Sequence, residues 1–409
     1  MHANSTIRLD RDALDENLQL IRSVLDPKTA FCAVVKADAY GVGAERIVPR
    51  MVEQGVDLLA VYSLAEAAEI GVFSGSTPIL VLMPVREIDR GAATLGLLAR
   101  NRLHLVAHST EQVACLEDEV AVFGNLLHLH LEIDTGMGRG GCDLKEASQV
   151  LKQIAANPRL RLAGVMTHLP DPIGDPDMAR RQKEELAEFV AAHQELIPAG
   201  CKFHAAASAG VISDDSLRMD MVRLGLAWTG LVDHLPSSAS QGMELRDGLR
   251  PVLSWWSDII HLRQISKGQS VGYGTGWQAS RDSLIGVVPA GYAHGFPMPQ
   301  RGSSHRVVVH GCSGPVSVPV VGPVNMDQIT LDLTNAGPVN AGDAVELISN
   351  DLNSPAHLLR LADRAGLKPH AILAGLNPRI PRVMVAGHTK AQQQSETLPM
   401  ESIRIAKGG

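Results

Sequence analysis

Residues 31–43 read FCAVVKADAYGVG, and this stretch decides the fold prediction. Five apolar residues, 31–35, run without polar interruption into Lys36, as is typical of a strand buried on both faces in a parallel sheet. A turn with Tyr40 and two glycines follows, and residues 44–54 then show an amphipathic pattern. The stretch therefore predicts one strand, loop and helix of an α/β protein.

Lys36 stands where this buried strand meets its loop. Burying an ammonium group is costly, so such a lysine either extends its amine to solvent or has a chemical use. A lysine near the low-dielectric end of a strand can lose its proton and attack carbonyl groups, which is the route to Schiff-base chemistry. The stretch by itself leaves both interpretations open.

Composition limits the class of protein. The 409 residues favour two domains over one, and 45% hydrophobic with 20% charged residues is typical of a globular protein with a large core. The net charge of -7 argues against a surface for nucleic acid or for an anionic membrane, so we expect neither partner. The five cysteines are scattered without a C-x-x-C pair, which indicates free thiols in a reducing compartment. Residues 1–6 do not resemble a secretory signal and no apolar run reaches transmembrane length, so we expect a cytoplasmic protein.

Strand-like apolar runs alternate with helical patterns through the first half of the chain. Asp10 is expected to cap a helix that ends before Pro27, and Asp175 caps another that covers 176–197. The strand-like runs are 30–35, 57–62, 78–83, 103–107, 126–133, 160–166, 202–205 and 221–226. Eight strands alternating with helices predict a (β/α)8 TIM-type barrel over residues 10–240, with a doubly wound open sheet as the alternative.

The chemistry of such a barrel lies at the carboxyl ends of its strands, and phosphate is typically held by the loops after strands seven and eight. Lys36 ends the first strand, while Ser208 and the turn at 223–225 follow the seventh and eighth. We therefore expect the lysine and a phosphate site to share one rim.

The pattern changes after about residue 240. Short β-type runs separated by glycine and proline follow, with one helical interval near 355–365. These runs are 258–265, 284–288, 306–309, 316–321 and 344–348. They indicate a mostly β C-terminal domain, 241–386. At the other end of the chain, a separate strand is expected within residues 1–9. The polar tail, 387–409, has no hydrophobic period and is expected to be disordered.

The run 126–133 places His128, His130, Glu132 and Asp134 on one face of a strand, because strand side chains alternate with a period of two. The intervening leucines then face the helices. A His-x-His pair on a barrel strand is also how a metal-dependent hydrolase holds zinc, but further ligands at other strand ends are not evident apart from His168. A polar layer inside the barrel is the favoured interpretation, and no metal site is predicted.

Three more stretches combine glycine with polar or aromatic residues: DTGMGR at 134–139, VGYGT at 271–275 and GYAHG at 291–295. The chain has only four tyrosines, and three of them stand beside glycines. Glycines mark turns and tyrosines fill half-exposed positions, so each stretch by itself also has a purely structural interpretation.

Taken together, these stretches resemble the alanine racemase family, pyridoxal-phosphate enzymes built from a barrel and a β domain. The motifs follow in matching order from about Ile7 to Val385. AVVKADAYG at 33–41 is similar to the family's cofactor-lysine signature, which makes Lys36 the lysine that binds the cofactor and places Tyr40 on its phosphate.

The same resemblance implies the remaining roles in the site. Arg139 would contact the phenolic oxygen of the cofactor, His168 would lie beside its ring, and Arg223 would face the pyridine nitrogen. The SAG at 208–210 and the RLGL at 223–226 resemble phosphate-binding segments, which implicates Ser208, Gly225 and Leu226. In the β domain, VGYG matches the motif of a second catalytic base, Tyr273, and NMDQ at 325–328 resembles a substrate-binding segment with Met326 and Asp327.

The physical requirements of racemisation agree with this set. The cofactor is an electron sink that acidifies the Cα–H bond of an amino acid. Inversion needs proton-transfer groups on opposite faces, and the resemblance assigns Lys36 to one face and Tyr273, from the partner subunit of a homodimer, to the other. Arg223 does not give up a proton, so the pyridine nitrogen beside it stays unprotonated, which limits side reactions. The implied function is a racemase that interconverts L- and D-alanine and supplies D-alanine for peptidoglycan.

Several positions depart from the family pattern. Glu132 stands where many members have a lysine that becomes carbamylated, and we expect its carboxylate to position Arg139 without modification. Pro378 stands where an active-site tyrosine is usual, so we expect a larger pocket. The remaining departures are Asn325 for cysteine, Ala207 for asparagine, Thr229 for tyrosine and His294 for aspartate.

Three related functions stay open as alternatives. A racemase of broader specificity would use the larger pocket for serine or larger amino acids. A decarboxylase of the same architecture usually sets a carboxylate on the pyridine nitrogen, where this chain has Arg223. A non-catalytic pyridoxal-phosphate-binding protein with a similar barrel lacks the β domain and Tyr273.

Overall fold

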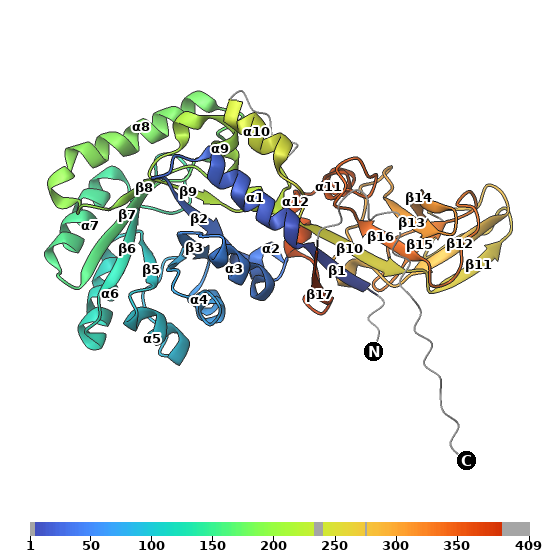
Figure 1. The fold of residues 1–409 in the computed structure, drawn as a ribbon, viewed down its shortest axis with the longest axis horizontal. Coiled ribbons are helices and arrows are strands. Elements are labelled where there is room, and N and C mark those ends of the chain that lie inside the picture. The colour runs from blue at the N-terminus through green and yellow to red at the C-terminus, as the bar shows by residue number, and fades with distance from the viewer. Residues whose placement is uncertain (1–4, 233–239, 275, 387–409) are drawn as a thin grey trace, which may run out of the picture.

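The computed structural model describes residues 5–232, 240–274 and 276–386. A barrel ringed by helices lies beside a second, mostly β part (Figure 1). The tail 387–409, expected to be disordered, lies outside the described residues. Within the described ranges, no helix has the length and apolar character needed to cross a membrane.

The barrel is formed by parallel strands in the order β8-β7-β6-β5-β4-β3-β2-β9. Its strands are β2 (Ala30–Val34), β3 (Leu58–Val61), β4 (Ile79–Val81), β5 (Leu103–Ala107), β6 (Leu127–Glu132), β7 (Leu160–Met166), β8 (Lys202–His204) and β9 (Met221–Leu224). β2 pairs with both β3 and β9, and Arg223 N–H donates to Ala206 O at 3.0 Å just beyond β8. The sheet is therefore nearly closed, which confirms the predicted barrel and all eight of its strands; the open-sheet alternative is wrong.

Helices cover the outside of the barrel (Figure 1). They are α1 (Arg11–Val24), α3 (Ala44–Glu53), α4 (Leu64–Gly71), α5 (Ala92–Ala99), α6 (Thr110–Phe123), α7 (Leu144–Ala156), α8 (Pro176–Ala192), α9 (Ser208–Ser213) and α10 (Ser240–Gly248), with 3-10 turns η1 (Gln194–Leu196), η2 (Asp215–Leu217) and η3 (Leu226–Thr229). The predicted caps are confirmed, because the Asp10 and Asp175 carboxylates accept hydrogen bonds from backbone N–H groups of α1 and α8. α8 ends at Ala192, before the predicted Ile197, because His193 leaves the helical conformation and its Nδ1 contacts Phe189 O at 2.9 Å.

The second sheet has the order β11-β12-β15-β14-β13-β16-β10-β1-β17. Its strands are β1 (Ser5–Asp10), β10 (Leu253–Asp258), β11 (His261–Ile265), β12 (Ser283–Val288), β13 (Arg306–Gly311), β14 (Gly314–Val321), β15 (Ile329–Asp332), β16 (Ala344–Ile348) and β17 (Arg382–Val385), with α11 (Leu358–Ala365), α12 (Pro369–Ala374) and the 3-10 turn η4 (Tyr292–His294) beside them. The prediction of one strand over 258–265 is wrong. The chain changes partners there, because Ile259 N–H bonds to Asp343 O while Ile260 N–H bonds to Val287 O.

The first strand belongs to this second sheet. β1 pairs antiparallel with β10 and parallel with β17, and Asp10 then leads straight into α1 of the barrel. The chain thus starts in the β part, forms the barrel and returns. The division into residues 10–240 and 241–386 stays a prediction; α10, just past it, contacts the barrel helices α1 and α9.

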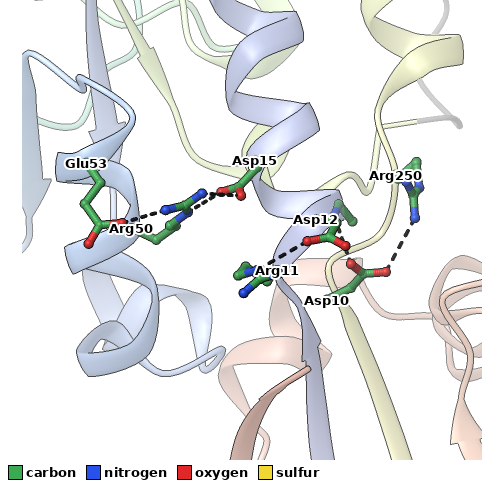
Figure 2. A network of polar contacts seen from close by, with 8 residues as sticks. Asp10, Arg11, Asp12, Asp15, Arg50, Glu53 and Arg250 are labelled. Atoms are coloured by element: carbon green, nitrogen blue, oxygen red, sulfur yellow. Dashed lines mark hydrogen bonds and ion pairs between the residues drawn. The ribbon is translucent and has the colours of Figure 1, made fainter. Parts of the chain in front are cut away.

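Polar contacts hold α1 where the two parts meet (Figure 2). Arg50 of α3 binds Asp15 at 2.5 Å and Glu53 at 2.6 Å, which ties α1 to the barrel. Arg250, where the chain returns to the second sheet, lies 3.4 Å from Asp10. Buried Asn17 accepts the Arg250 N–H at 2.8 Å. These contacts fix the helix to both parts and so help to hold the barrel rim in place relative to the β part.

Candidate active site

Lys36 leaves the carboxyl end of β2 and opens the short segment α2 (Lys36–Tyr40). Ala37, Asp38, Ala39 and Tyr40 have φ between 53° and 59°, so this turn is left-handed. Such a conformation costs about 1 to 2 kcal/mol for each residue with a side chain. Hydrogen bonds offset part of that cost, including one from Ala37 N–H to Glu66 Oε1 at 2.8 Å. The turn sets Lys36 and Tyr40 at the rim of the barrel.

The surroundings of Lys36 favour its free amine. Burial lowers the pKa of this half-buried lysine, the charge of Arg139 lowers it further, and Glu66 opposes both. A lysine with a lowered pKa carries more of the unprotonated amine that attacks a carbonyl. His370 of α12 also lies near Lys36. Burial lowers the pKa of His370, and the charges of Lys368 and Lys36 lower it further.

Sequence reasoning missed Glu66 and His370. Glu66 belongs to a capping box with Ser63, a spacing that is readable from sequence. Nothing in the sequence around His370 distinguishes it, because only the fold brings α12 against α2.

A set of donors gathers at the ends of β8 and β9. Ser208 Oγ accepts the N–H groups of Gly225 at 3.2 Å and Ala227 at 3.1 Å. A Cβ on Gly225 would lie 2.1 Å from the Tyr40 hydroxyl oxygen, so glycine is required for the tyrosine to approach this closely. Burial raises the pKa of Tyr40 to about 12, which keeps its hydroxyl as a donor. Leu226 follows directly and begins η3. Hydroxyls and backbone N–H groups beside a strand end are the donors that a phosphate needs.

Arg223 is buried beneath this rim, and its terminal nitrogens are engaged by the protein. Nη1 donates to His204 Nδ1 at 2.7 Å, and Nη2 donates to Thr167 O at 2.8 Å and Ala205 O at 3.0 Å. Nε has no hydrogen-bond partner among the described residues. Burial lowers the pKa of Arg223, but a guanidinium keeps its proton in proteins. Arg223 is therefore a fixed donor with one N–H left for a ligand.

His168 lies beside this arginine, with Nδ1 at 3.3 Å from Nη2. Burial, together with the charges of Arg223, Arg139 and Lys36, lowers the pKa of His168 to about 3. The imidazole is therefore neutral at physiological pH. Because the charges of Lys36, Arg139 and Arg223 all act on His168, the four side chains lie close together.

The loop 134–139 presents Arg139 at the same rim. The Asp134 carboxylate accepts the N–H groups of Gly136 and Gly138, each at 3.0 Å. Burial alone would raise the pKa of Asp134, but these backbone donors outweigh it and lower the value. Asp134 thus shapes the loop, and Arg139 is left exposed at its end.

Glu132, just before this loop, contacts a histidine. Its Oε2 lies 3.2 Å from His108 Nδ1, and no ion pair with Arg139 occurs in the part of the chain that the structure describes. Burial raises the pKa of Glu132, while Arg223 and Arg139 oppose that rise. Positioning of Arg139 by Glu132 stays a prediction, and the structure adds His108 as a partner.

The polar face of β6 lies inside the barrel, as predicted. His130 and Glu132 are buried there, while the intervening leucines are fully buried on the opposite side. Both ring nitrogens of His130 are in hydrogen bonds, to His104 and His204, each at 3.0 Å. Among the described residues, no group of His, Cys, Asp and Glu side chains is arranged to hold a metal ion.

The β-domain motifs assemble on a different surface. Tyr273, in the loop between β11 and β12, is 82% exposed, and that loop packs on Pro323 just before NMDQ. The N–H groups of Tyr292 and Ala293 donate to Asn325 O and Met326 O, each at 3.0 Å. Met326 and Asp327 are exposed. The structure thus joins the 271–274, 291–295 and 325–328 segments.

Tyr273 does not meet the barrel site within one chain. β11 and β12 lie at the end of the second part farthest from the barrel (Figure 1). The barrel rim brings together Lys36, Tyr40, Arg139, His168, Ser208, Arg223, Gly225 and Leu226, whereas Tyr273 makes no hydrogen bond to a barrel residue in the described ranges.

The remaining departures from the family pattern have these positions. Pro378 is exposed between α12 and β17, next to Asn377, whose side chain donates to Ala293 O at 2.8 Å. Thr229 is buried and its hydroxyl donates to Leu226 O. The other three lie as follows: Ala207 precedes α9, His294 Nδ1 accepts the Gly291 N–H, and Asn325 Oδ1 is buried without a hydrogen-bond partner among the described residues.

Comparisons with known proteins agree with this geometry. The family model described as alanine racemase, N-terminal domain, matches residues 9–233, and the model of the C-terminal domain matches residues 252–384. The alanine racemase of Synechocystis is 32% identical over 383 residues, covering 93% of this chain and 98% of the relative. The alanine racemase of Streptococcus equi subsp. zooepidemicus is 31% identical over 385 residues, covering 93% of this chain and 98% of the relative.

Solved structures show the same fold. The alanine racemase of E. faecalis is 28% identical with a TM-score of 0.78, covering 94% of this chain and 99% of that one. That of Bacillus anthracis with bound L-Ala-P is 26% identical with a TM-score of 0.79, covering 94% and 96%. The Bartonella henselae protein, which carries covalently bound pyridoxal phosphate, is 24% identical with a TM-score of 0.77, covering 94% and 100%.

Proposed function

The chain belongs to the alanine racemase family, and we propose that it interconverts L- and D-alanine with pyridoxal phosphate as its cofactor. One observation carries the proposal. A half-buried lysine with a lowered pKa, Lys36, shares a rim with the donors around Ser208 and with a buried arginine, Arg223.

The residues of this rim fit pyridoxal phosphate. Ser208 and Tyr40 would hold the phosphate with their hydroxyls. The backbone N–H groups around Gly225 and Leu226 would join them once those of Gly225 and Ala227, which Ser208 Oγ accepts in this structure, turn to the phosphate. The absence of a Cβ on Gly225 lets the Tyr40 hydroxyl approach this backbone. Lys36 would bind the carbonyl carbon of the cofactor. His168 would lie beside the ring, Arg139 would contact the phenolic oxygen, and Arg223, with its unengaged Nε–H, would face the pyridine nitrogen.

When bound, pyridoxal phosphate supplies an electron sink that acidifies the Cα–H bond of the amino acid. Lys36 accepts or returns the Cα proton on one face, which its lowered pKa favours. The partner subunit's Tyr273 does the same on the other face. Because Arg223 stays protonated, it donates to the pyridine nitrogen and adds no proton to it.

We propose a homodimer with shared active sites. Tyr273, Met326 and Asp327 are exposed on the β domain. The strands β11 and β12 that flank Tyr273 lie at the end of the β part farthest from the barrel, so a second copy is needed to bring Tyr273 to Lys36. Met326 and Asp327 would contact the substrate from the same direction. We place the enzyme in the cytoplasm, where it supplies D-alanine for peptidoglycan; all five cysteines are free thiols.

Borohydride reduction followed by peptide mapping tests the proposal, because it makes the reversible bond between lysine and cofactor permanent. We expect the label on Lys36 alone and none in Lys36→Ala, with Lys28→Ala labelled like the wild type. Cofactor on another lysine, or none at all, would refute the site. Racemisation of L-alanine is then measured with the same three proteins.

The exposed Pro378 in place of a tyrosine favours a wider choice of substrate. We therefore expect kcat/KM for serine within about tenfold of that for alanine, since one small group in a pocket changes specificity by roughly that factor. Strict preference for alanine would contradict the larger pocket, and Pro378→Tyr is the matched variant.

A further inference from the structure

A cavity of about 500 Å³ opens at the amino ends of the barrel strands, on the side opposite Lys36. It lies where Ala30, Leu58 and Met221 begin their strands, far from the proposed cofactor site. The side chains around it that matter are Arg22, Lys28, Arg161, Lys202, His104 and His128. The racemisation proposed above uses no residue at this end of the barrel.

The lining carries an excess of positive charge. Lys28, Arg161 and Lys202 form no ion pair in the described part of the chain, whereas Arg22 is engaged with Asp57 at 2.7 Å. Asp57 is the one acidic residue of the lining. Cations gathered around a concave, partly enclosed space raise the local concentration of anions.

A chain of histidines runs from Arg223 to this cavity. Arg223 Nη1 lies 2.7 Å from His204 Nδ1, His204 Nε2 lies 3.0 Å from His130 Nδ1, and His130 Nε2 lies 3.0 Å from His104 Nδ1. His104 and His130 both line the cavity. The chain therefore connects the two ends of the barrel through its interior.

The direction of every hydrogen bond in this chain follows from Arg223. A guanidinium only donates, so His204 Nδ1 must accept, and a neutral His204 carries its proton on Nε2. By the same reasoning His130 Nδ1 accepts from His204 Nε2–H, and His104 Nδ1 accepts from His130 Nε2–H. Burial lowers the pKa of all three histidines, which keeps them neutral. The last N–H of the chain is therefore on His104 Nε2, which has no partner among the described residues.

A second polar atom at the cavity also lacks a partner. His128 Nδ1 is buried and makes no hydrogen bond within the described residues, and the His128 ring stacks on His104 with centroids 4.7 Å apart. Arg161 pairs in register with His128 on the neighbouring strand. Two imidazoles and an unpaired guanidinium thus stand together at one wall.

We propose that this cavity binds a small multivalent oxyanion, which accepts the His104 Nε2–H and neutralises Arg161 and Lys202, and that its binding is coupled through His130 and His204 to Arg223. An anion that accepts from His104 polarises each bond of the chain, because hydrogen bonds in series strengthen one another. His204 Nδ1 then becomes a stronger acceptor for Arg223. The binding site is independent of the proposed function; only the consequence of the coupling rests on Arg223 facing the cofactor.

Calorimetric titration of the cofactor-loaded protein tests the site, since bound cofactor fills the phosphate donors at the other rim. The probes are inorganic phosphate, glycerol phosphate and citrate, with chloride as the monovalent control. We expect binding of at least one multivalent probe, and an affinity about tenfold or more weaker in the double variant Arg161→Gln/Lys202→Gln, since each lost cation contact contributes up to about tenfold. The double variant Arg100→Gln/Lys152→Gln removes the same charge from exposed positions, at the C-cap of α5 and within α7, and should bind like the wild type.

The three probes identify the source of the anion. Preference for glycerol phosphate indicates a phosphate monoester, preference for inorganic phosphate indicates the free ion, and preference for citrate indicates a polycarboxylate. No binding by any of them, or equal affinities in both double variants, would overturn the site.

NMR of protein labelled at its histidines tests the coupling without measuring activity. We expect His104, His130 and His204 as neutral Nε2–H tautomers, and a change in the His204 signals on saturation with the best probe. His130→Phe interrupts the chain and should abolish that change when the variant is saturated with the same probe. An Nδ1–H tautomer at any of the three, or a His204 signal that ignores the probe in the wild type, would overturn the coupling.

Discussion

Lys36, Arg139 and Arg223 place three cationic groups around one rim, and the carboxylates of Glu66 and Glu132 oppose them. Burial lowers the pKa of Lys36, and the like charge of Arg139 lowers it further, which favours the free amine needed to attach the cofactor. The cationic groups also leave a net attraction for anions. A cofactor with a phosphate and a phenolic oxygen matches that balance.

Glu132 provides the first prediction at this scale. Glu132→Gln should lower kcat/KM for alanine by about tenfold, because the carboxylate near Arg139 and His108 is lost and a misplaced charged group costs roughly that factor. Steady-state racemisation measures it, and Glu184→Gln on the exposed side of α8 is the control. Unchanged kinetics in Glu132→Ala would remove the idea that this residue positions Arg139.

At the scale of elements, the left-handed turn α2 has the most consequence for the site. It packs against α12 of the β part, and a Cβ on Gly41 would lie 2.1 Å from Leu373 O. The strained turn is thus held from both sides, by Glu66 from the barrel and by α12. A change in either support would move Lys36.

Ala37→Gly should stabilise the protein by up to about 1 kcal/mol, because Ala37 is exposed with φ of 53° and glycine adopts that conformation without strain. The same substitution at exposed Ala187 of α8 should destabilise by about 1 kcal/mol, because there glycine only adds flexibility to a right-handed helix. Urea denaturation of both variants compares the free energies of unfolding. Equal losses would show that the turn carries no strain.

At the scale of the molecule, the buried histidines link stability to pH. Burial lowers the pKa of His130 and His168 to about 3 from 6.5, and lowers those of His104 and His204 in the same direction. Between pH 6.5 and 3 the unfolded chain therefore binds more protons than the folded one. Their contribution is fully present above pH 6.5 and is lost as the pH falls towards 3, at up to about 1.4 kcal/mol per histidine and pH unit.

We therefore expect the urea concentration at the midpoint of unfolding to decrease when the pH is lowered from 7.5 to 5.0. The decrease should be smaller in His130→Phe than in the wild type. His261→Gln changes an exposed histidine and should follow the wild type. An acid-independent midpoint, or an identical fall in all three proteins, would contradict the burial of neutral histidines in the barrel.

The shared active site makes a further prediction for the whole assembly. Lys36→Ala and Tyr273→Phe should each be inactive, since a lost proton-transfer group costs about 10² to 10⁴ in rate. When the two are unfolded together and refolded, half of the dimers combine one chain of each kind and hold one intact site. Activity should then return to about a quarter of wild type.

No recovery on mixing would mean that Tyr273 does not act across subunits. Tyr292→Phe, the other exposed tyrosine of the β part, is the control and should stay active by itself.

Local patterns in the sequence determined much of this protein. The apolar runs predicted all the barrel strands, the caps at Asp10 and Asp175 predicted two helix starts, and the alternation in 126–133 predicted a polar layer inside the barrel. Periodicity and capping involve residues a few positions apart, so they are readable without the fold. The order of the motifs likewise determined which family the chain resembles.

Only the tertiary structure decided which distant residues meet. It placed β1 between β10 and β17, split the run 258–265 between two partners, and aligned His104, His130 and His204 with Arg223. It also turned residues 37–40 left-handed, against their local preference. Each of these depends on contacts between segments far apart in the chain, whose free energy outweighs local propensity and is not written in any short stretch of sequence.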